Sequence, residues 1–257
     1  MKKILLIYFL SFHAISELTL EITQGTEDPY RVAIIKFSGA EKATTDIQKV
    51  VFDNLLRTGE FTIFNNEDLL SIPQIEEDIV FNDFRILDID FLVMGKVEDD
   101  GLNITVEYEV FDISKAKKIR TSTVYGIPNK NRQLAHYVSD GIYQEITGIP
   151  GIASTKLLYV TEDNDFKLLI SDADGSNEQV LLESTEPIIS PSWSPDSKKV
   201  AYVSFETGIA KVYIQDIASG NRQVAVENSS QISSPAWSPD GKFLSLTMYQ
   251  DGNAEIY

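Results

Sequence analysis

The chain has 257 residues, 43% of them hydrophobic, and a formal net charge of −17 at pH 7. This length and apolar content suffice for a globular protein with more than one core, whereas the negative charge disfavours binding to nucleic-acid phosphates or anionic lipid surfaces. Cysteine is absent, so stability must come from ordinary packed cores and not from disulfides.

The N-terminus predicts a cleavable secretory signal peptide over residues 1–16. Lys2 and Lys3 precede a short apolar run at residues 4–15, and the small residues Ala14 and Ser16 place the cleavage after Ser16. The run is too short to span a bilayer comfortably, and no later segment has membrane length. We therefore expect an exported protein without direct membrane insertion. An N-terminal core strand is the alternative interpretation.

Residues 17–150 predict an α/β domain with a mixed sheet and two main helices. Hydrophobic alternation and apolar runs predict strands over residues 18–22, 30–37, 61–64, 91–97, 102–112 and 118–125. Helical spacing predicts helices over residues 45–58 and 132–148, the first capped by Thr44 or Thr45 and ended by Gly59. The predicted core face of the second helix comprises Leu134, Tyr137, Val138, Ile142 and Ile146.

Residues 151–257 predict the first blades of an all-β propeller. The segment Ser-Pro-Ser-Trp-Ser-Pro-Asp-Ser-Lys at 190–198 returns 44 residues later as Ser-Pro-Ala-Trp-Ser-Pro-Asp-Gly-Lys at 234–242. A period of about 40–45 residues is typical of one four-stranded blade. The Ser-Pro-Asp-Ser and Ser-Pro-Asp-Gly segments favour type I turns that lead into strands. Strands are predicted over residues 156–161, 167–172, 199–204, 210–216, 242–247 and 254–257.

The number of repeats indicates an open ring. A propeller closes with typically four to eight blades, while the repeat region has room for roughly two and a half. We therefore expect the chain to be the N-terminal part of a longer protein, holding two blades and part of a third.

Catalytic and cofactor motifs do not stand out in this sequence. The patterns G-x-S-x-G, Walker A, G-x-G-x-x-G and H-E-x-x-H are absent. His136, the only histidine after the predicted signal, is expected to be a satisfied surface or boundary residue. Asp172 and Asp174 suggest calcium superficially, but the EF-hand pattern does not follow, so turn aspartates are expected. We predict no cofactor and no metal.

The order of these parts resembles the TolB family of periplasmic propeller proteins. The resemblance rests on Glu-Ile-Thr-Gly-Ile-Pro-Gly at residues 145–151, Leu-Leu-Ile-Ser-Asp-Ala-Asp-Gly at residues 168–175, and the paired Ser-Pro-x-Trp-Ser-Pro-Asp repeats. It implies a six-bladed ring in the full-length protein. It also implies a monomeric, non-enzymatic periplasmic interaction protein of the Tol-Pal system. Such a protein would link inner-membrane TolA and outer-membrane Pal, for outer-membrane integrity and invagination during cell division.

The resemblance further implies two partner sites. The TolA side maps to an alternating segment that suits strand addition to a sheet edge, or pairing within its own domain: Glu17, Leu18, Thr19, Leu20, Glu21, Ile22 and Thr23. The Pal side maps to the loops before the Ser-Pro-x-Trp elements: Glu186, Ser190, Gln231, Ile232, Ser233 and Ser234. Relatives place a histidine where this chain has Gln231, which keeps a hydrogen-bonding side chain but removes the titratable ring.

Two other classes of protein remain open at this point. Similar repeats cap the catalytic domain of exported prolyl-oligopeptidase-type serine peptidases, and a downstream G-x-S-x-G elbow would support that alternative. About three and a half further repeats would instead support the TolB family. A stand-alone sugar- or peptide-binding propeller would show a deep channel lined by aromatic residues.

Overall fold

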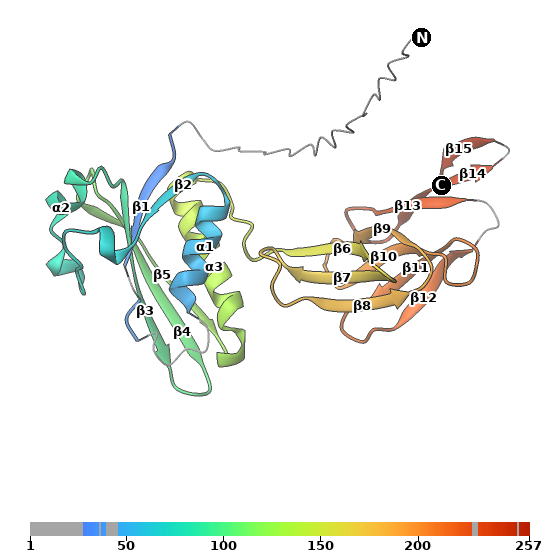
Figure 1. Ribbon diagram of the computed structural model, residues 1–257, viewed down its shortest axis with the longest axis horizontal. Helices are drawn as coiled ribbons and strands as arrows, with labels where there is room; N and C mark the ends of the chain where they lie inside the picture. Colours follow the sequence, from blue (N-terminus) through green and yellow to red (C-terminus); the bar gives the residue numbers. More distant parts are fainter. Residues whose placement is uncertain (1–27, 36, 40–45, 228–230, 251) are drawn as a thin grey trace, which may run out of the picture.

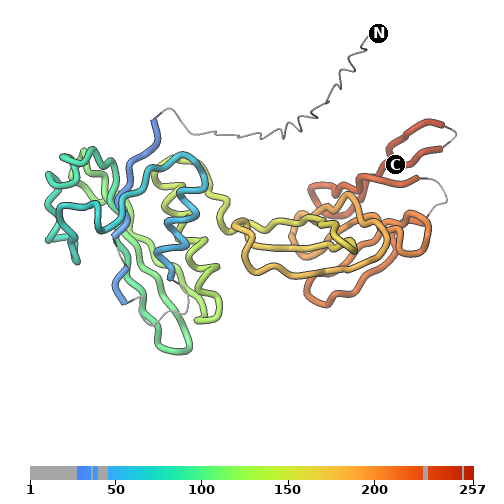
Figure 2. The backbone as a smooth tube through the Cα atoms, in the orientation of Figure 1, coloured from blue at the N-terminus to red at the C-terminus, as the bar shows by residue number. Residues whose placement is uncertain are grey.

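The computed structural model describes residues 28–35, 37–39, 46–227, 231–250 and 252–257. Figure 1 shows an α/β domain and a β-rich domain joined by a short connection, and Figure 2 follows the chain through it from blue to red. This arrangement confirms the predicted fold class. The predicted signal peptide and the predicted strand at 18–22 lie outside the described residues. Within the described ranges, no helix has both the length and the hydropathy of a membrane span.

The α/β domain is built on a mixed sheet with the strand order β2-β1-β3-β4-β5. Its strands are β1 (Tyr30–Ile34), β2 (Phe61–Phe64), β3 (Phe91–Asp99), β4 (Ile104–Asp112) and β5 (Lys117–Gly126). β1 pairs in parallel with β2 and β3, while β3, β4 and β5 form an antiparallel meander. All five lie at or within a few residues of their predicted positions.

The helices cover both faces of this sheet. They are α1 (Ile47–Arg57), α2 (Phe81–Ile86) and α3 (Asn131–Thr147), with short 3-10 turns η2 (Asn66–Asp68), η3 (Glu76–Asp78) and η4 (Pro128–Lys130). Successive strand residues point to opposite faces, so Val32 packs in the core under α1 and α3, whereas Ala33 packs with Phe84 of α2. The sheet is therefore buried on both sides.

Two details of the predicted helices are wrong. The cap of α1 is Asp46, whose side chain accepts a hydrogen bond from the Lys49 backbone at 3.0 Å, and not Thr44 or Thr45. On α3, Tyr137 is 44% exposed. Because α1 packs against the side of α3 that carries Ala135, Tyr137 is turned towards solvent. The other four predicted core residues of α3 are buried.

The β-rich domain consists of three antiparallel sheets in sequence order. The first sheet contains β6 (Lys156–Glu162), β7 (Phe166–Asp172) and β8 (Gln179–Ser184). The second contains β9 (Ile188–Trp193), β10 (Lys199–Ser204), β11 (Lys211–Asp216) and β12 (Arg222–Glu227). The third contains β13 (Ile232–Trp237), β14 (Leu244–Gln250) and β15 (Asn253–Ile256). The second sheet is a complete four-stranded blade.

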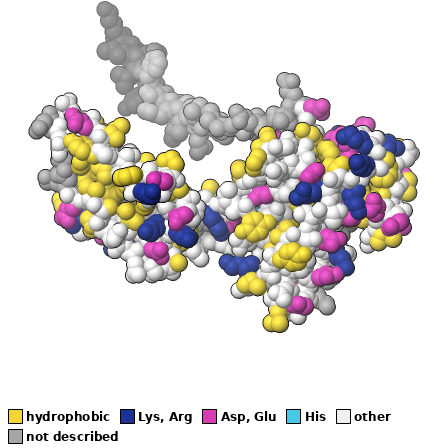
Figure 3. All heavy atoms as spheres, turned by 180° about the vertical axis from the view of Figure 1, so that it is seen from behind, with side chains coloured by type: hydrophobic (Ala, Val, Ile, Leu, Met, Phe, Trp, Pro, Cys, Tyr) yellow, Lys and Arg dark blue, Asp and Glu magenta, His cyan; other side chains and the backbone are white. Residues whose placement is uncertain are grey.

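Apolar residues fill the spaces between these sheets. Leu168 of β7 packs with Val200 and Tyr202 of β10, and Val203 packs with Leu246 of β14. The sheets thus bury the faces that they turn towards one another, as blades require. On the outer surface basic side chains lie among acidic ones (Figure 3), and several form ion pairs, such as Lys118 with Glu109 at 2.8 Å.

Candidate functional site

One face of α3 carries polar residues at intervals of four: Arg132, His136 and Asp140. Residues with this spacing lie on the same side of a helix, and here that side meets the first blade. The Arg132 guanidinium donates from Nε, at 2.9 Å, and from Nη2 to one carboxylate oxygen of Asp174. Asp140 accepts hydrogen bonds from the backbone N–H groups of Ala153 at 2.6 Å and Ser154 at 3.0 Å. The helix therefore holds both the blade and the connection to it.

His136 lies at the centre of this contact and is 2% exposed. The prediction that it lies on the surface or its boundary is wrong, because the first blade covers it. Its Nδ1 atom lies 2.9 Å from the Asn54 amide nitrogen, which also donates to Ser139 Oγ at 2.9 Å. Ser139 in turn donates its proton to the Ala135 carbonyl at 2.8 Å. These hydrogen bonds make Nδ1 an acceptor, so the proton of the neutral ring is on Nε2.

The Nε2 atom faces two carboxylates of the β-rich domain. It lies 3.6 Å from Asp172 Oδ2 and 3.8 Å from Asp174 Oδ2, too far for a hydrogen bond to either, and it makes no hydrogen bond to any described residue. Burial lowers the pKa of His136, and the attraction of the two carboxylates only partly opposes that shift. The ring is therefore held neutral beside two acids.

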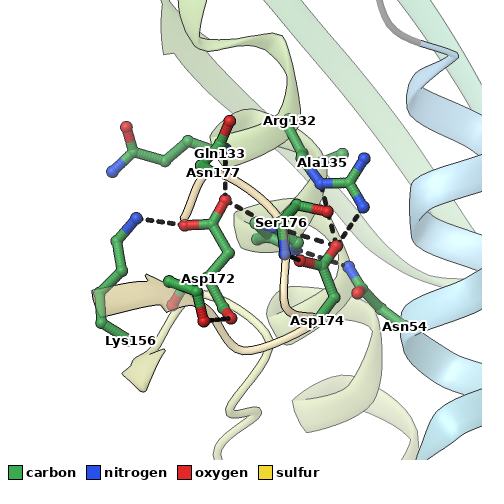
Figure 4. Close-up of polar contacts among 12 residues, drawn as sticks. Asn54, Arg132, Gln133, Ala135, Lys156, Asp172, Asp174, Ser176 and Asn177 are labelled. Carbon is green, nitrogen blue, oxygen red and sulfur yellow. Dashed lines mark hydrogen bonds and ion pairs between the residues drawn. The ribbon is translucent and has the colours of Figure 1, made fainter. Parts of the chain in front are cut away.

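Both carboxylates have cationic partners, as Figure 4 shows for Arg132 with Asp174 and Lys156 with Asp172. Burial alone would raise the pKa of Asp172, but hydrogen bonds from Lys156 and Asn177 outweigh it, so its pKa is lowered. The pKa of Asp174 is likewise lowered, because hydrogen bonds from the Ser176 backbone and Arg132 outweigh its burial. Both groups stay ionised.

A metal ion does not fit this cluster well, although His136, Asp172 and Asp174 place ligand atoms within 4.8 Å of one another. A metal would compete with Arg132 and Lys156 for the same carboxylate oxygens, and it would need the Nε2 lone pair where the neutral ring carries its proton. The sequence pattern predicted both acids as turn residues. Asp174 does have a turn role, since it accepts a hydrogen bond from the Ser176 backbone N–H at 2.9 Å. The contact of the two acids with α3 was not predicted.

The predicted Pal-side residues lie on and before β9 and β13, which pack beside each other. Ser190 and Ser234 both have a φ of 53°, and each lies where the register with the neighbouring strand shifts. Each is followed by a proline, Pro191 or Pro235, which has no N–H to donate to the ladder. The bulge accommodates that missing donor and bends the strand. Backbone conformations of this kind often lie at binding sites.

The remaining predicted residues divide by exposure. Glu186 and Gln231 are exposed and Ser233 is half-buried. Ile232 is 2% exposed and packs with Val203 in the core between blades, so its side chain is not part of the outer surface. The predicted TolA-side segment, residues 17–23, lies outside the described residues.

Comparisons with known proteins match both domains. The family described as TolB amino-terminal domain matches residues 18–119, and the family described as TolB beta propeller domain matches residues 143–257. The Tol-Pal system protein TolB of Alcanivorax borkumensis is 39% identical over 197 residues, which cover 74% of this chain and 45% of the relative. The protein of the same name from Alkalilimnicola ehrlichii is 37% identical over 202 residues, covering 76% and 47%.

A solved structure agrees with the arrangement described above. The crystal structure of TolB from Acinetobacter baumannii has a TM-score of 0.83 and 33% identity, and the match covers 92% of this chain and 59% of that one. The agreement therefore includes both domains, and it confirms the resemblance found in the sequence. The chain spans about half the length of the curated relatives it matches.

Proposed function

Because the chain belongs to the TolB family, we propose that it is a non-enzymatic binding component of the Tol-Pal system in the periplasm. The observation that carries this proposal is the match of both domains, in the same order, to proteins named for that system. The partners proposed are TolA at the inner membrane and the lipoprotein Pal at the outer membrane. Linking them would serve outer-membrane integrity and invagination during cell division.

The geometry of the described residues supports binding over catalysis. The buried histidine and its two carboxylates are engaged by Arg132, Lys156 and Asn54, which leaves no activated nucleophile or base at that cluster. No observation among the described residues favours the serine-peptidase alternative.

The TolA contact is assigned to residues 17–23. Their alternation of apolar and polar residues, with Leu18, Leu20 and Ile22 on one face, suits addition of a strand to a sheet edge of the partner. In such an arrangement main-chain hydrogen bonds provide affinity, and the apolar face provides specificity.

The Pal contact is assigned to the surface around the two bulges, namely Glu186, Ser190, Gln231, Ser233 and Ser234. The equivalent strained backbones at Ser190 and Ser234, on strands that pack beside each other, support a shared binding surface at this end of the blades.

Calorimetry with the full-length protein, lacking its signal peptide, tests both contacts. Deletion of residues 17–23 should abolish TolA binding and leave Pal binding intact. The substitutions Leu20→Pro and Glu21→Pro provide a finer test, since only alternate amides face the partner strand. One of the two should abolish TolA binding and the other should be tolerated. Equal effects would contradict strand addition.

For the Pal contact, Gln231→Ala should weaken Pal binding without affecting TolA binding. Lys198→Ala is the matched control, because Lys198 is also exposed but follows the Ser-Pro-Asp turn after the far end of β9. Equal loss in both variants, or none in either, would remove Gln231 from the assigned surface.

A further inference from the structure

The contact between α3 and the first blade is balanced in charge only while His136 is neutral. Arg132 and Lys156 provide two positive charges, and Asp172 and Asp174 provide two negative ones. A protonated His136 would add a fifth charge with no counterpart in the cluster. Because the ring is 2% exposed and the side chains of the two acids are 4% and 1% exposed, water cannot compensate that charge well.

The hydrogen bonds on the other side of the ring also require the neutral form. Protonation at Nδ1 would place an N–H opposite the Asn54 amide nitrogen, a second donor, at 2.9 Å. Rotating the amide of Asn54 would not resolve this conflict without cost. Its carbonyl oxygen accepts from Arg57 Nη1 at 3.3 Å and its nitrogen donates to Ser139, so the rotated amide would place its nitrogen next to the Arg57 guanidinium.

The other charged groups around the ring do not reverse this preference. On α3, Asp140 is engaged by the backbone N–H groups of Ala153 and Ser154. The two carboxylates of the blade favour a charged ring, while Arg132 of α3 opposes it. Burial is the largest influence, and together these lower the pKa of His136.

We propose that His136 is an acid-sensitive latch between the α/β domain and the first blade, which holds the two together when its ring is neutral and releases them when it is protonated. This inference does not depend on the proposed partners. It rests on the buried ring, the balanced cluster and the acceptor role of Nδ1.

The direction of the pH dependence follows from linkage. A ring freed from the contact has a pKa near the ordinary histidine value of 6.5, whereas the docked ring takes up its proton only at lower pH. The docked contact is therefore fully stable above that value and weakens as the pH falls below it. Each unit of difference between the two pKa values corresponds to a roughly tenfold change in the docking equilibrium.

Distance measurements between the domains test the latch directly. The chain has no cysteine, so Lys49→Cys on α1 and Lys198→Cys in the second blade, both exposed, give two labelling sites in this part of the molecule. They are introduced into the full-length protein after any cysteine of the remaining sequence has been replaced by serine. Double electron–electron resonance should give a narrow distance distribution at about pH 8 that broadens towards about pH 5. A distribution that stays narrow would overturn the proposal.

The matched variant is His136→Gln, which keeps an acceptor for Asn54 and a donor towards the carboxylates but cannot titrate. Its distance distribution should not change with pH. If it broadens as the wild type does, another group is responsible and the latch is wrong. Added Zn²⁺ should leave the wild-type distribution unchanged at about pH 7.5. Narrowing by Zn²⁺ that His136→Gln abolishes would instead establish a metal centre.

A second measurement remains informative if His136→Gln fails to fold. Once the predicted signal is removed, His136 is the only histidine in this chain. In NMR spectra of the histidine-labelled full-length protein, its ring signal is therefore the one that remains when every histidine of the remaining sequence is replaced. The proton on Nε2 should be visible at neutral pH, and the ring should titrate below 6.5. A titration at or above that value would overturn the proposal.

Discussion

Ser197 and Gly241 occupy equivalent positions of the two repeats and share a left-handed backbone, with φ values of 56° and 70°. Each donates its backbone N–H at 2.9 Å to the first residue of its Ser-Pro-Asp turn, Ser197 to Ser194 and Gly241 to Ser238. A residue with a Cβ pays about 1–2 kcal/mol for this conformation, while glycine adopts it freely. One repeat therefore contains strain that the other avoids.

Exchanging these residues should shift stability in opposite directions. Ser197→Gly should raise the free energy of unfolding by up to about 1 kcal/mol, because relief of strain exceeds the entropy cost of glycine. Gly241→Ser should lower it by a similar amount; the added Cβ meets only Pro195, at an ordinary 3.7 Å. Urea denaturation of both variants measures the difference. Changes of the same sign would show that backbone strain does not govern these turns.

Gly141 of α3 is predicted to tolerate no side chain. A Cβ there would lie 1.9 Å from the Tyr108 hydroxyl oxygen, and Tyr108 is 2% exposed and cannot move away easily. Gly141→Ala should therefore destabilise the α/β domain by about 1–3 kcal/mol. Adding Tyr108→Phe should recover part of this loss, whereas Gln144→Ala, at an exposed position of the same helix, should have almost no effect. Thermal denaturation of the four proteins provides the comparison.

Asp112, at the end of β4, should contribute to the loss of stability in acid. Burial would raise the pKa of this carboxyl, but hydrogen bonds from the Lys115 ammonium, Ser114 Oγ and the Lys115 backbone lower it to about 2. Its contribution is thus present above the unfolded value of 3.8 and is lost as the pH falls towards 2.

Asp112→Asn should accordingly cost about 1–2 kcal/mol at neutral pH and progressively less in acid. Asp53→Asn, which removes an exposed pair with Lys49, should cost about 0.5 kcal/mol or less. Unfolding curves from about pH 7 down to about pH 3 compare the two. A constant cost of Asp112→Asn across this range would contradict the assigned hydrogen bonds.

The connection between the domains should become sensitive to proteases when Asp140 is replaced. Its carboxylate fixes the Ala153 and Ser154 backbone, so Asp140→Ala leaves both N–H groups without that acceptor. Limited proteolysis should then cleave within residues 148–155 several-fold faster. Asp163→Ala, in the exposed turn after β6, is the control, and equal acceleration by both would show a general loss of stability.

Local patterns predicted the elements whose apolar spacing is regular. The strands of the mixed sheet and the helices α1 and α3 were predicted, because each turns one or both faces to a core along its whole length and its apolar residues therefore recur at regular intervals. Helix α2 was missed because it has only six residues and is held by the burial of Phe84, which is a tertiary effect. The strands β9 and β13 were not predicted, because the prolines of the repeat motif disfavour strand pairing. The bulges at Ser190 and Ser234 accommodate these prolines.

The interface cluster could not be located from the local sequence, because His136 and its acidic partners belong to different domains. Its burial depends on docking of the first blade over α3. One signal was available: Arg132, His136 and Asp140 form a polar row on an otherwise amphipathic helix. Such a row indicates a second contact surface, but it does not say what covers it.

The two faces of α3 have a consequence for genetic screens. One face lies in the domain core and comprises Leu134, Val138, Ile142 and Ile146. The other face touches the first blade or the connection to it, through Arg132, His136 and Asp140. Substitutions on the first face should reduce the amount of protein that accumulates, whereas those on the second should leave normal amounts of a protein whose domains no longer move as one. When the abundance and the activity of variants are measured together along this helix, the substitutions should therefore fall into two classes. Positions of the two classes should alternate along the helix, and each class should recur every four residues.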